Sequence, residues 1–197
     1  MTRLLGLGQE EKNLIYRSNF YLPDDKWRKW IFQDSKWFRQ DGYHHVRTGY
    51  AGYGLSPLEI TMANFRIHFD AEFVTSYNET DQYGVIFRRN DRNNDYLWYY
   101  FFISRAGYYT LGFHFLADWK TIIDNRFSEF IKRGDATNSL MVEMVGQKIT
   151  LGVNGHILDT VMDNKIAKGY FAIYVTGERT DSYVEARFRN FRLYSLE

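Results

Sequence analysis

Hydrophobic and polar residues alternate along most of this chain, which is the pattern of β-strands with one buried face. In the clearest run every second residue is apolar: Phe65, Ile67, Phe69, Ala71 and Phe73. The polar residues between them, which we expect to face outward, are Arg66, His68, Asp70 and Glu72. Similar runs predict strands over 14–20, 83–89, 95–104, 108–115, 170–175 and 184–194. The chain is therefore predicted to be all-β.

The stretch 138–163 predicts three strands joined by tight turns. Apolar residues alternate from Leu140 onward, and Gly146-Gln147 and Asn154-Gly155 interrupt the alternation. Asn-Gly between two alternating runs favours a type I′ turn, because both central residues of that turn take positive φ. A meander of this kind requires an antiparallel sheet.

Two segments lack this pattern. We expect 118–131 to be an extended crossover with Trp119, Ile122 and Ile131 as core plugs, and a short helix is the alternative. The Gly- and Tyr-rich segment 48–57 is expected to be a loop. Because no repeat, linker or low-complexity tract divides the chain, we expect one domain over 14–197, preceded by a short N-terminal arm over 1–13.

Several motifs follow one another in an order that is informative about the fold: YGVIFR, YYFFISRAGYYTLGFH, DWKTII, GQKITLGVNG, GYFAIYV and VEARFRNFRLY. This order resembles the concanavalin A-like lectin/glucanase superfamily, in particular bacterial laminin-G-like and keto-disaccharide hydrolase-like domains. The likeness covers residues 60–197 and, more loosely, 14–50. It implies a two-sheet antiparallel jelly-roll sandwich whose concave sheet often binds glycans. The matching residues are turn and core residues, so they carry no chemistry by themselves.

Charge and cysteine content narrow the classes of function. The chain has 25 Lys and Arg against 24 Asp and Glu, a net charge of +1, so nucleic acid or an anionic membrane is not the expected partner. It has no cysteine, which excludes disulfides, thiolate catalysis and Cys-ligated zinc. The first residues lack an apolar run long enough for a signal peptide or a membrane span. A cytoplasmic location is favoured, and a processed form is the alternative.

Aromatic residues make up 19% of the chain, and the run 95–104 is apolar on both faces. A strand of that kind is either covered on both sides or uses one face for binding. The candidate ligand-binding residues on the outward face are His68, Arg88, Trp98, Tyr100, Phe102 and His114. They suit a sugar, since rings stack on its C–H faces, but also the centre of a protein interface. As a third alternative, 27–37 or 48–57 covers these rings.

Catalysis and metal binding rest on fewer residues. Asp70 and Glu72 share a strand face and are the candidate catalytic pair of a glycosidase, which requires two carboxyl groups. The glucanases of the superfamily carry a fuller Glu-x-Asp-x-(x)-Glu strand, so we expect these residues to be a solvated face. Asp91, Asn93 and Asp95 are oxygen-rich candidates for calcium but lack EF-hand spacing. No other cofactor is expected.

The sequence thus favours a non-catalytic binding module that binds carbohydrate through an aromatic face. The alternative is an accessory subunit that docks into a larger protein assembly through the same face and the arm over 1–13. A glycoside hydrolase is the third hypothesis.

Overall fold

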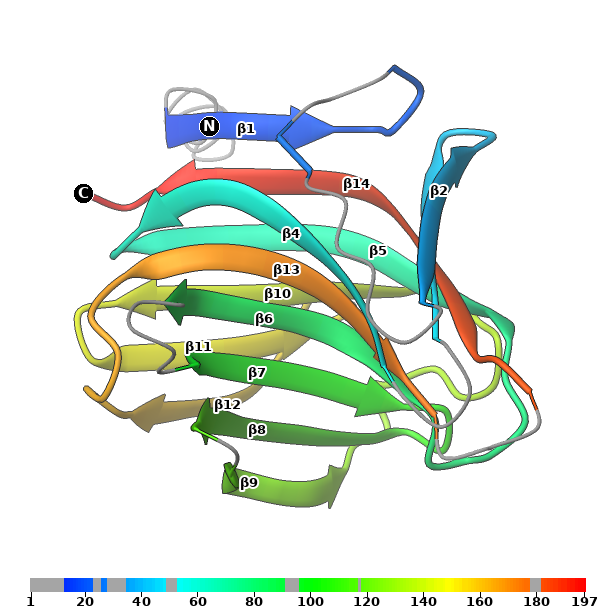
Figure 1. Cartoon of the computed structure of the whole chain (residues 1–197). Helices are drawn as coiled ribbons and strands as arrows, with labels where there is room; N and C mark the ends of the chain where they lie inside the picture. The colour runs from blue at the N-terminus through cyan, green and yellow to red at the C-terminus, as the bar shows by residue number, and fades with distance from the viewer. Residues whose placement is uncertain are drawn as a thin grey trace, which may run out of the picture.

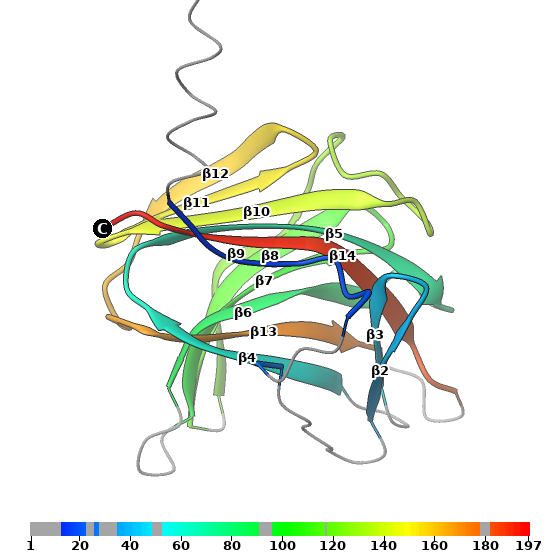
Figure 2. The same cartoon turned by 90° about the horizontal axis from the view of Figure 1, so that it is seen from above.

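The computed structural model describes residues 13–22, 26–27, 35–48, 53–90, 96–116, 118–177 and 182–197. Within these ranges the chain forms fourteen strands in two antiparallel sheets. We call the eight-stranded sheet the A sheet and the six-stranded sheet the B sheet. Figures 1 and 2 show them as two stacked layers. The predicted all-β jelly-roll sandwich is confirmed.

The strands are not in chain order within the sheets. The A sheet has the order β12 (His156–Met162), β11 (Lys148–Val153), β10 (Asn138–Val145), β5 (Phe65–Thr75), β14 (Glu185–Ser195), β3 (Tyr43–Arg47) and β2 (Lys36–Gln40), and β1 (Leu14–Ser18) also pairs with β14. The B sheet has the order β4 (Tyr53–Met62), β13 (Gly169–Thr176), β6 (Gln82–Asn90), β7 (Leu97–Ser104), β8 (Tyr108–Phe115) and β9 (Asp118–Phe127). The chain therefore crosses repeatedly between the layers.

One hydrophobic core lies between the two sheets. From the A sheet it receives the predicted inward residues of β5 together with residues of β10, β11 and β14. From the B sheet it receives every second residue of β6, β7, β8 and β13. Phe65, for example, lies edge-on against Phe171 of the opposite sheet at 4.7 Å between ring centroids. The period-two alternation thus predicted the buried face of these strands correctly.

The meander over 138–163 is confirmed. β10 and β11 pair around Gly146-Gln147, and β11 and β12 pair around Asn154-Gly155. Asn154 and Gly155 have φ of 51° and 84°, so both central residues are left-handed, as a type I′ turn requires.

Two local expectations are wrong. Residues 53–57 are not loop but the start of β4, which tolerates Pro57 because β4 is an edge strand whose outer side needs no ladder donor. The segment 118–131 is not a crossover in its first part, since β9 pairs with β8 and extends the B sheet. Ile131 is buried in the core and the partly buried Ile122 packs against it, as predicted, whereas Trp119 is 45% exposed and does not belong to the core.

Some expectations lie outside the described residues, namely the arm over 1–13 apart from Asn13, residues 28–34 and the oxygen-rich turn over 91–95. In the part of the chain that the structure describes, no helix has the length and apolar character needed to cross a membrane.

Candidate aromatic site on the outer face of the B sheet

The outward face of the B sheet carries a second hydrophobic cluster, separate from the core. Strand β7 supplies the predicted outward residues Trp98, Tyr100 and Phe102, whose neighbours in the cluster are Leu55, Ile86, Ala172, Tyr174 and the partly buried Tyr53. Although they face away from the core, the three β7 rings are only 3–8% exposed. The rings are therefore packed against one another, and the face is a preorganised aromatic surface.

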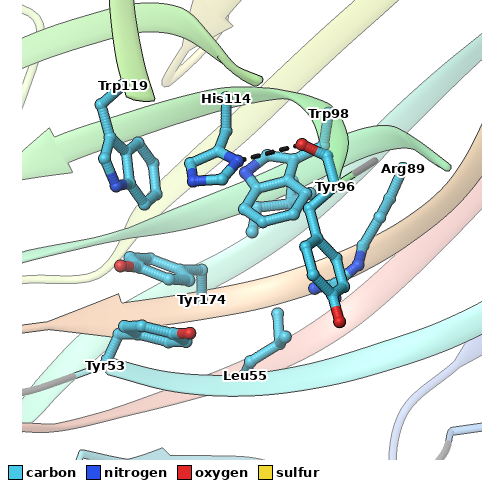
Figure 3. Close-up of a pocket in the computed structure, with 9 residues that line it drawn as sticks. Tyr53, Leu55, Arg89, Tyr96, Trp98, His114, Trp119 and Tyr174 are labelled. Carbon is cyan, nitrogen blue, oxygen red and sulfur yellow. Dashed lines mark hydrogen bonds between the residues drawn. The ribbon is translucent and has the colours of Figure 1, made fainter. Parts of the chain in front are cut away.

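The rings are held in defined orientations. Trp98 and His114, which are register partners on β7 and β8, stack at 4.1 Å with planes 3° apart. Phe102 stacks on Tyr174 at 4.5 Å, and Tyr53 stacks on Tyr174 at 5.5 Å. Trp119, from edge strand β9, stands edge-on to Trp98 at 6.2 Å and forms one wall of the surface (Figure 3).

A hollow of about 250 Å³ opens among these rings. Its lining residues are Tyr53, Leu55, Ile86, Arg89, Tyr96, Trp98, His114, Trp119 and Tyr174. Apolar walls with a few placed polar groups are typical of small-ligand sites. The volume lies just below the range of about 300–1,000 Å³ that drug-sized ligands occupy, so the hollow suits a single ring.

Arg89 supplies the positive charge of the hollow. Its guanidinium carbon lies 4.7 Å from the Trp98 ring centroid and 5.6 Å from that of Tyr170, within cation–π range. The side chain is only 3% exposed, so the charge is fixed in place rather than carried on a mobile surface chain.

The indole Nε1 of Trp98 is buried and makes no hydrogen bond within the described part of the chain. A buried donor without an acceptor costs about 1–3 kcal/mol, and such a group in a native structure calls for an explanation. An oxygen of a bound ligand would satisfy this donor.

His114 offers the complementary acceptor. Its Nδ1 lies 3.1 Å from the carbonyl oxygen of Tyr96, which can only accept, so Nδ1 carries the proton. Burial lowers the pKa of His114 below 6.5, and the charge of Arg89 lowers it further, against the opposing effects of the Tyr96 carbonyl and Asp118. The ring is therefore neutral at pH 7, and Nε2 keeps its lone pair.

Arg88 was expected on this face, and that prediction is wrong. The register of β6 shifts between Phe87 and Asn90, and Arg88 has a left-handed φ of 49°. This β-bulge places an extra residue on the inward side, so Arg88 is buried and Arg89 takes the outward position. The guanidinium of Arg88 donates to backbone carbonyls, with 3.0 Å from Nε to Ala63 O.

His68, Asp70 and Glu72 do not join the aromatic residues, because they face outward from β5 in the other sheet. Glu72 accepts a hydrogen bond from Arg187 Nε at 2.6 Å and another from Thr137. Asp70 accepts from Asn190 Nδ2 at 2.7 Å, and His68 lies edge-on to Tyr194. The opposite layers of the sandwich thus separate these carboxylates from the aromatic hollow.

The remaining candidate site residues fall into two groups. Trp98, Tyr100, Phe102 and His114 lie together as expected, whereas Asp91, Asn93 and Asp95 lie outside the described residues. Among the residues that are described, no three His, Asp or Glu side chains gather as metal ligands would. The sequence reasoning missed Arg89, Tyr53, Trp119 and Tyr174. Of these four, only Tyr174 could have been found from the sequence, since its alternation with the inward Ile173 and Val175 indicates an outward side chain.

Comparison with solved structures finds the same architecture at low sequence identity. Carbohydrate binding module CBM66 from Bacillus subtilis matches with a TM-score of 0.70 at 13% identity, over 86% of this chain and 96% of that chain. The Bacillus licheniformis β-glucanase matches with a TM-score of 0.68 at 8% identity, over 92% and 98%. A Bacillus subtilis protein of unknown function with a galectin-like fold also scores 0.68, at 9% identity over 92% and 96%.

No protein-family model matches the sequence, and neither does any curated protein. At these identities the structural likeness establishes the fold and leaves the chemistry open, since its matches include both binding modules and glycosidases. The chain has the concanavalin A-like jelly-roll fold that the order of its motifs predicted.

Proposed function

We propose that this chain is a non-catalytic carbohydrate-binding module and that the aromatic hollow of the B sheet is its ligand site. The observation that carries the proposal is the buried Nε1 of Trp98, which has no hydrogen-bond partner among the described residues, on a ring that lines the aromatic hollow. A ring such as Trp119 covers the apolar C–H face of a sugar, while Trp98 Nε1 donates to a ring or hydroxyl oxygen.

The polar groups around the hollow complement the hydroxyls of a sugar. Neutral His114 accepts through Nε2, and the guanidinium of Arg89 donates without being able to accept. Burial raises the pKa of the Tyr53 and Tyr174 phenols, so both hydroxyls stay protonated and can donate as well as accept. Because the hollow holds about 250 Å³, we expect it to take one terminal sugar ring rather than an extended chain.

The positions of the carboxylate side chains support a binding role rather than glycoside hydrolysis. Glycosidases use two carboxyl groups on either side of the scissile bond. Among the described residues that line the hollow there is no Asp or Glu. Asp70 and Glu72 lie on the other sheet and are hydrogen-bonded to Asn190, Arg187 and Thr137.

The experiment is a glycan array followed by calorimetric titration of the best ligand with wild-type protein and with Trp119→Ala. Trp119 is half exposed, so its removal should leave the fold intact while the affinity falls about tenfold or more, as for a central aromatic anchor. Tyr77→Ala removes an equally exposed ring elsewhere and should bind like the wild type.

Three results would contradict the proposal. Unchanged affinity in Trp119→Ala would remove the hollow as the site. Release of new reducing ends from the bound oligosaccharide would identify a hydrolase. A protein complex that Trp119→Ala dissociates, together with no glycan binding by the wild type, would favour the docking hypothesis.

A further inference from the structure

A second hollow lies on the outward face of the A sheet, where β1 meets β14. Its volume is about 470 Å³, and its lining residues are Arg17, Ser18, Asn19, Asn190, Phe191 and Arg192. Phe191 is buried beneath it, and the other side chains are polar. Because this hollow and the aromatic site belong to different sheets, the inference stands independently of the proposed function.

Two arginines face each other across the hollow. Arg17 and Arg192 are direct register partners in the antiparallel β1–β14 pair, and both are exposed. In the described part of the chain neither side chain makes an ion pair or a hydrogen bond. Like charges that lie directly opposite each other on antiparallel strands are destabilising, so this pair opposes folding unless an anion lies between them.

Neighbouring arginines on the same face do not share this arrangement. Arg187 pairs with Glu72, and Arg66 pairs with Glu143 at 2.8 Å. The neighbouring carboxylate on β5, Asp70, accepts a hydrogen bond from Asn190 and so is already engaged. Among the described residues, the sheet thus gives these arginines acidic cross-strand partners, whereas the register partners of Arg17 and Arg192 are each other and His68.

We propose that this hollow binds a saccharide that carries a sulfate or phosphate ester, with the ester held between Arg17 and Arg192. A guanidinium presents a planar fork of donors that matches an oxyanion in two parallel hydrogen bonds. A volume of about 470 Å³ exceeds what a bare oxyanion needs and falls within the range of small-molecule sites. The hydroxyl of Ser18 and the amide of Asn19 suit the sugar hydroxyls beside the ester.

The first test uses dextran sulfate and unmodified dextran as a matched pair of probes, titrated into the whole protein at low salt. Dextran sulfate should bind and dextran should not. Arg17→Ala and Arg192→Ala should each weaken binding about tenfold or more, the usual effect of losing a charge-assisted hydrogen bond. Lys148→Ala removes one positive charge from the outward face of β11 in the same sheet and should bind like the wild type.

The second test is Arg192→Glu, which replaces the like-charge pair with an opposite-charge pair. It should raise the midpoint of thermal unfolding and abolish binding of dextran sulfate, while Trp119→Ala leaves that binding unchanged.

Equal binding of dextran sulfate by the wild type and both arginine-to-alanine variants would overturn the proposal. An equal loss of binding in Lys148→Ala would also overturn it. If inorganic sulfate bound as tightly as dextran sulfate, the hollow would recognise the anion alone, and the proposal of a saccharide ligand would be overturned. Binding to phosphatidylserine vesicles without binding to dextran sulfate would overturn it as well.

Discussion

Arg88 is the residue whose replacement tests the packing argument most directly. Its buried guanidinium donates to Ala63 O and Ile166 O, which lie in two of the connections where the chain crosses between the sheets, after β4 and after β12. It also donates to Gly146 O, in the turn between β10 and β11, at 3.0 Å. One side chain therefore joins three separate backbone segments at one end of the sandwich, and Arg88→Ala should destabilise the whole fold.

The size of the effect follows from these three acceptors. A hydrogen bond to a charged group contributes about 1.5–3 kcal/mol net. Burial lowers the pKa of Arg88, which shows that the guanidinium loses hydration and offsets part of that gain. With the lower figure for each acceptor, Arg88→Ala should lower the free energy of unfolding by about 4 kcal/mol. For a domain of this size that corresponds to a midpoint lower by about 8–16 °C.

Urea denaturation followed by tryptophan fluorescence and circular dichroism measures this loss. Arg88→Lys keeps the charge but not the planar fork, so it should recover less than half of the stability. Arg105→Ala, which breaks a partly exposed pair with Asp135 at 3.3 Å, should cost less than about 1 kcal/mol. A loss below about 1 kcal/mol in Arg88→Ala would refute the structural role that we assign to the bulge.

Two further predictions concern pH and close packing. Burial, with smaller effects of Arg39 and His45, holds the pKa of His44 well below 6.5, so below pH 6.5 the unfolded state binds a proton that the folded state does not. Stability should therefore fall with decreasing pH at up to about 1.4 kcal/mol per pH unit. In urea titrations from pH 7 to 5, His44→Gln should flatten that slope, and an unchanged slope would contradict the assignment. An ideal Cβ on Gly84 would lie 2.1 Å from Phe101 O, so Gly84→Ala should cost about 2 kcal/mol or more. An added Cβ on Gly134 has nothing within 4 Å, so Gly134→Ala should lower the free energy of unfolding by about 1 kcal/mol, mainly because of its positive φ of 69°. An equal loss of stability in Gly84→Ala and Gly134→Ala would refute the steric argument.

Much of the fold could be predicted from sequence because it rests on local periodicity. The inward residues of β5 and β10 follow from alternation alone, and the Asn154-Gly155 turn follows from its need for positive φ. The assembly of the aromatic site could not be predicted in the same way. Tyr53 and Trp119 come from the two outermost strands of the B sheet, and only the strand order brings both to one surface. Periodicity says which face a residue occupies, not which strands share that face.

The two hollows share a structural feature that the alternation of apolar and polar residues does not reveal. In β6 the bulge turns Arg88 inward and allows Arg89 to reach the aromatic hollow. In β14 the register shifts between Arg189 and Arg192, and Asn190 has a φ of 54°. Without that extra residue the alternation from Phe188 would turn Arg192 into the core. A β-bulge therefore places an arginine at each hollow, because one extra residue reverses the direction of the following side chains while the strand stays paired with its neighbours.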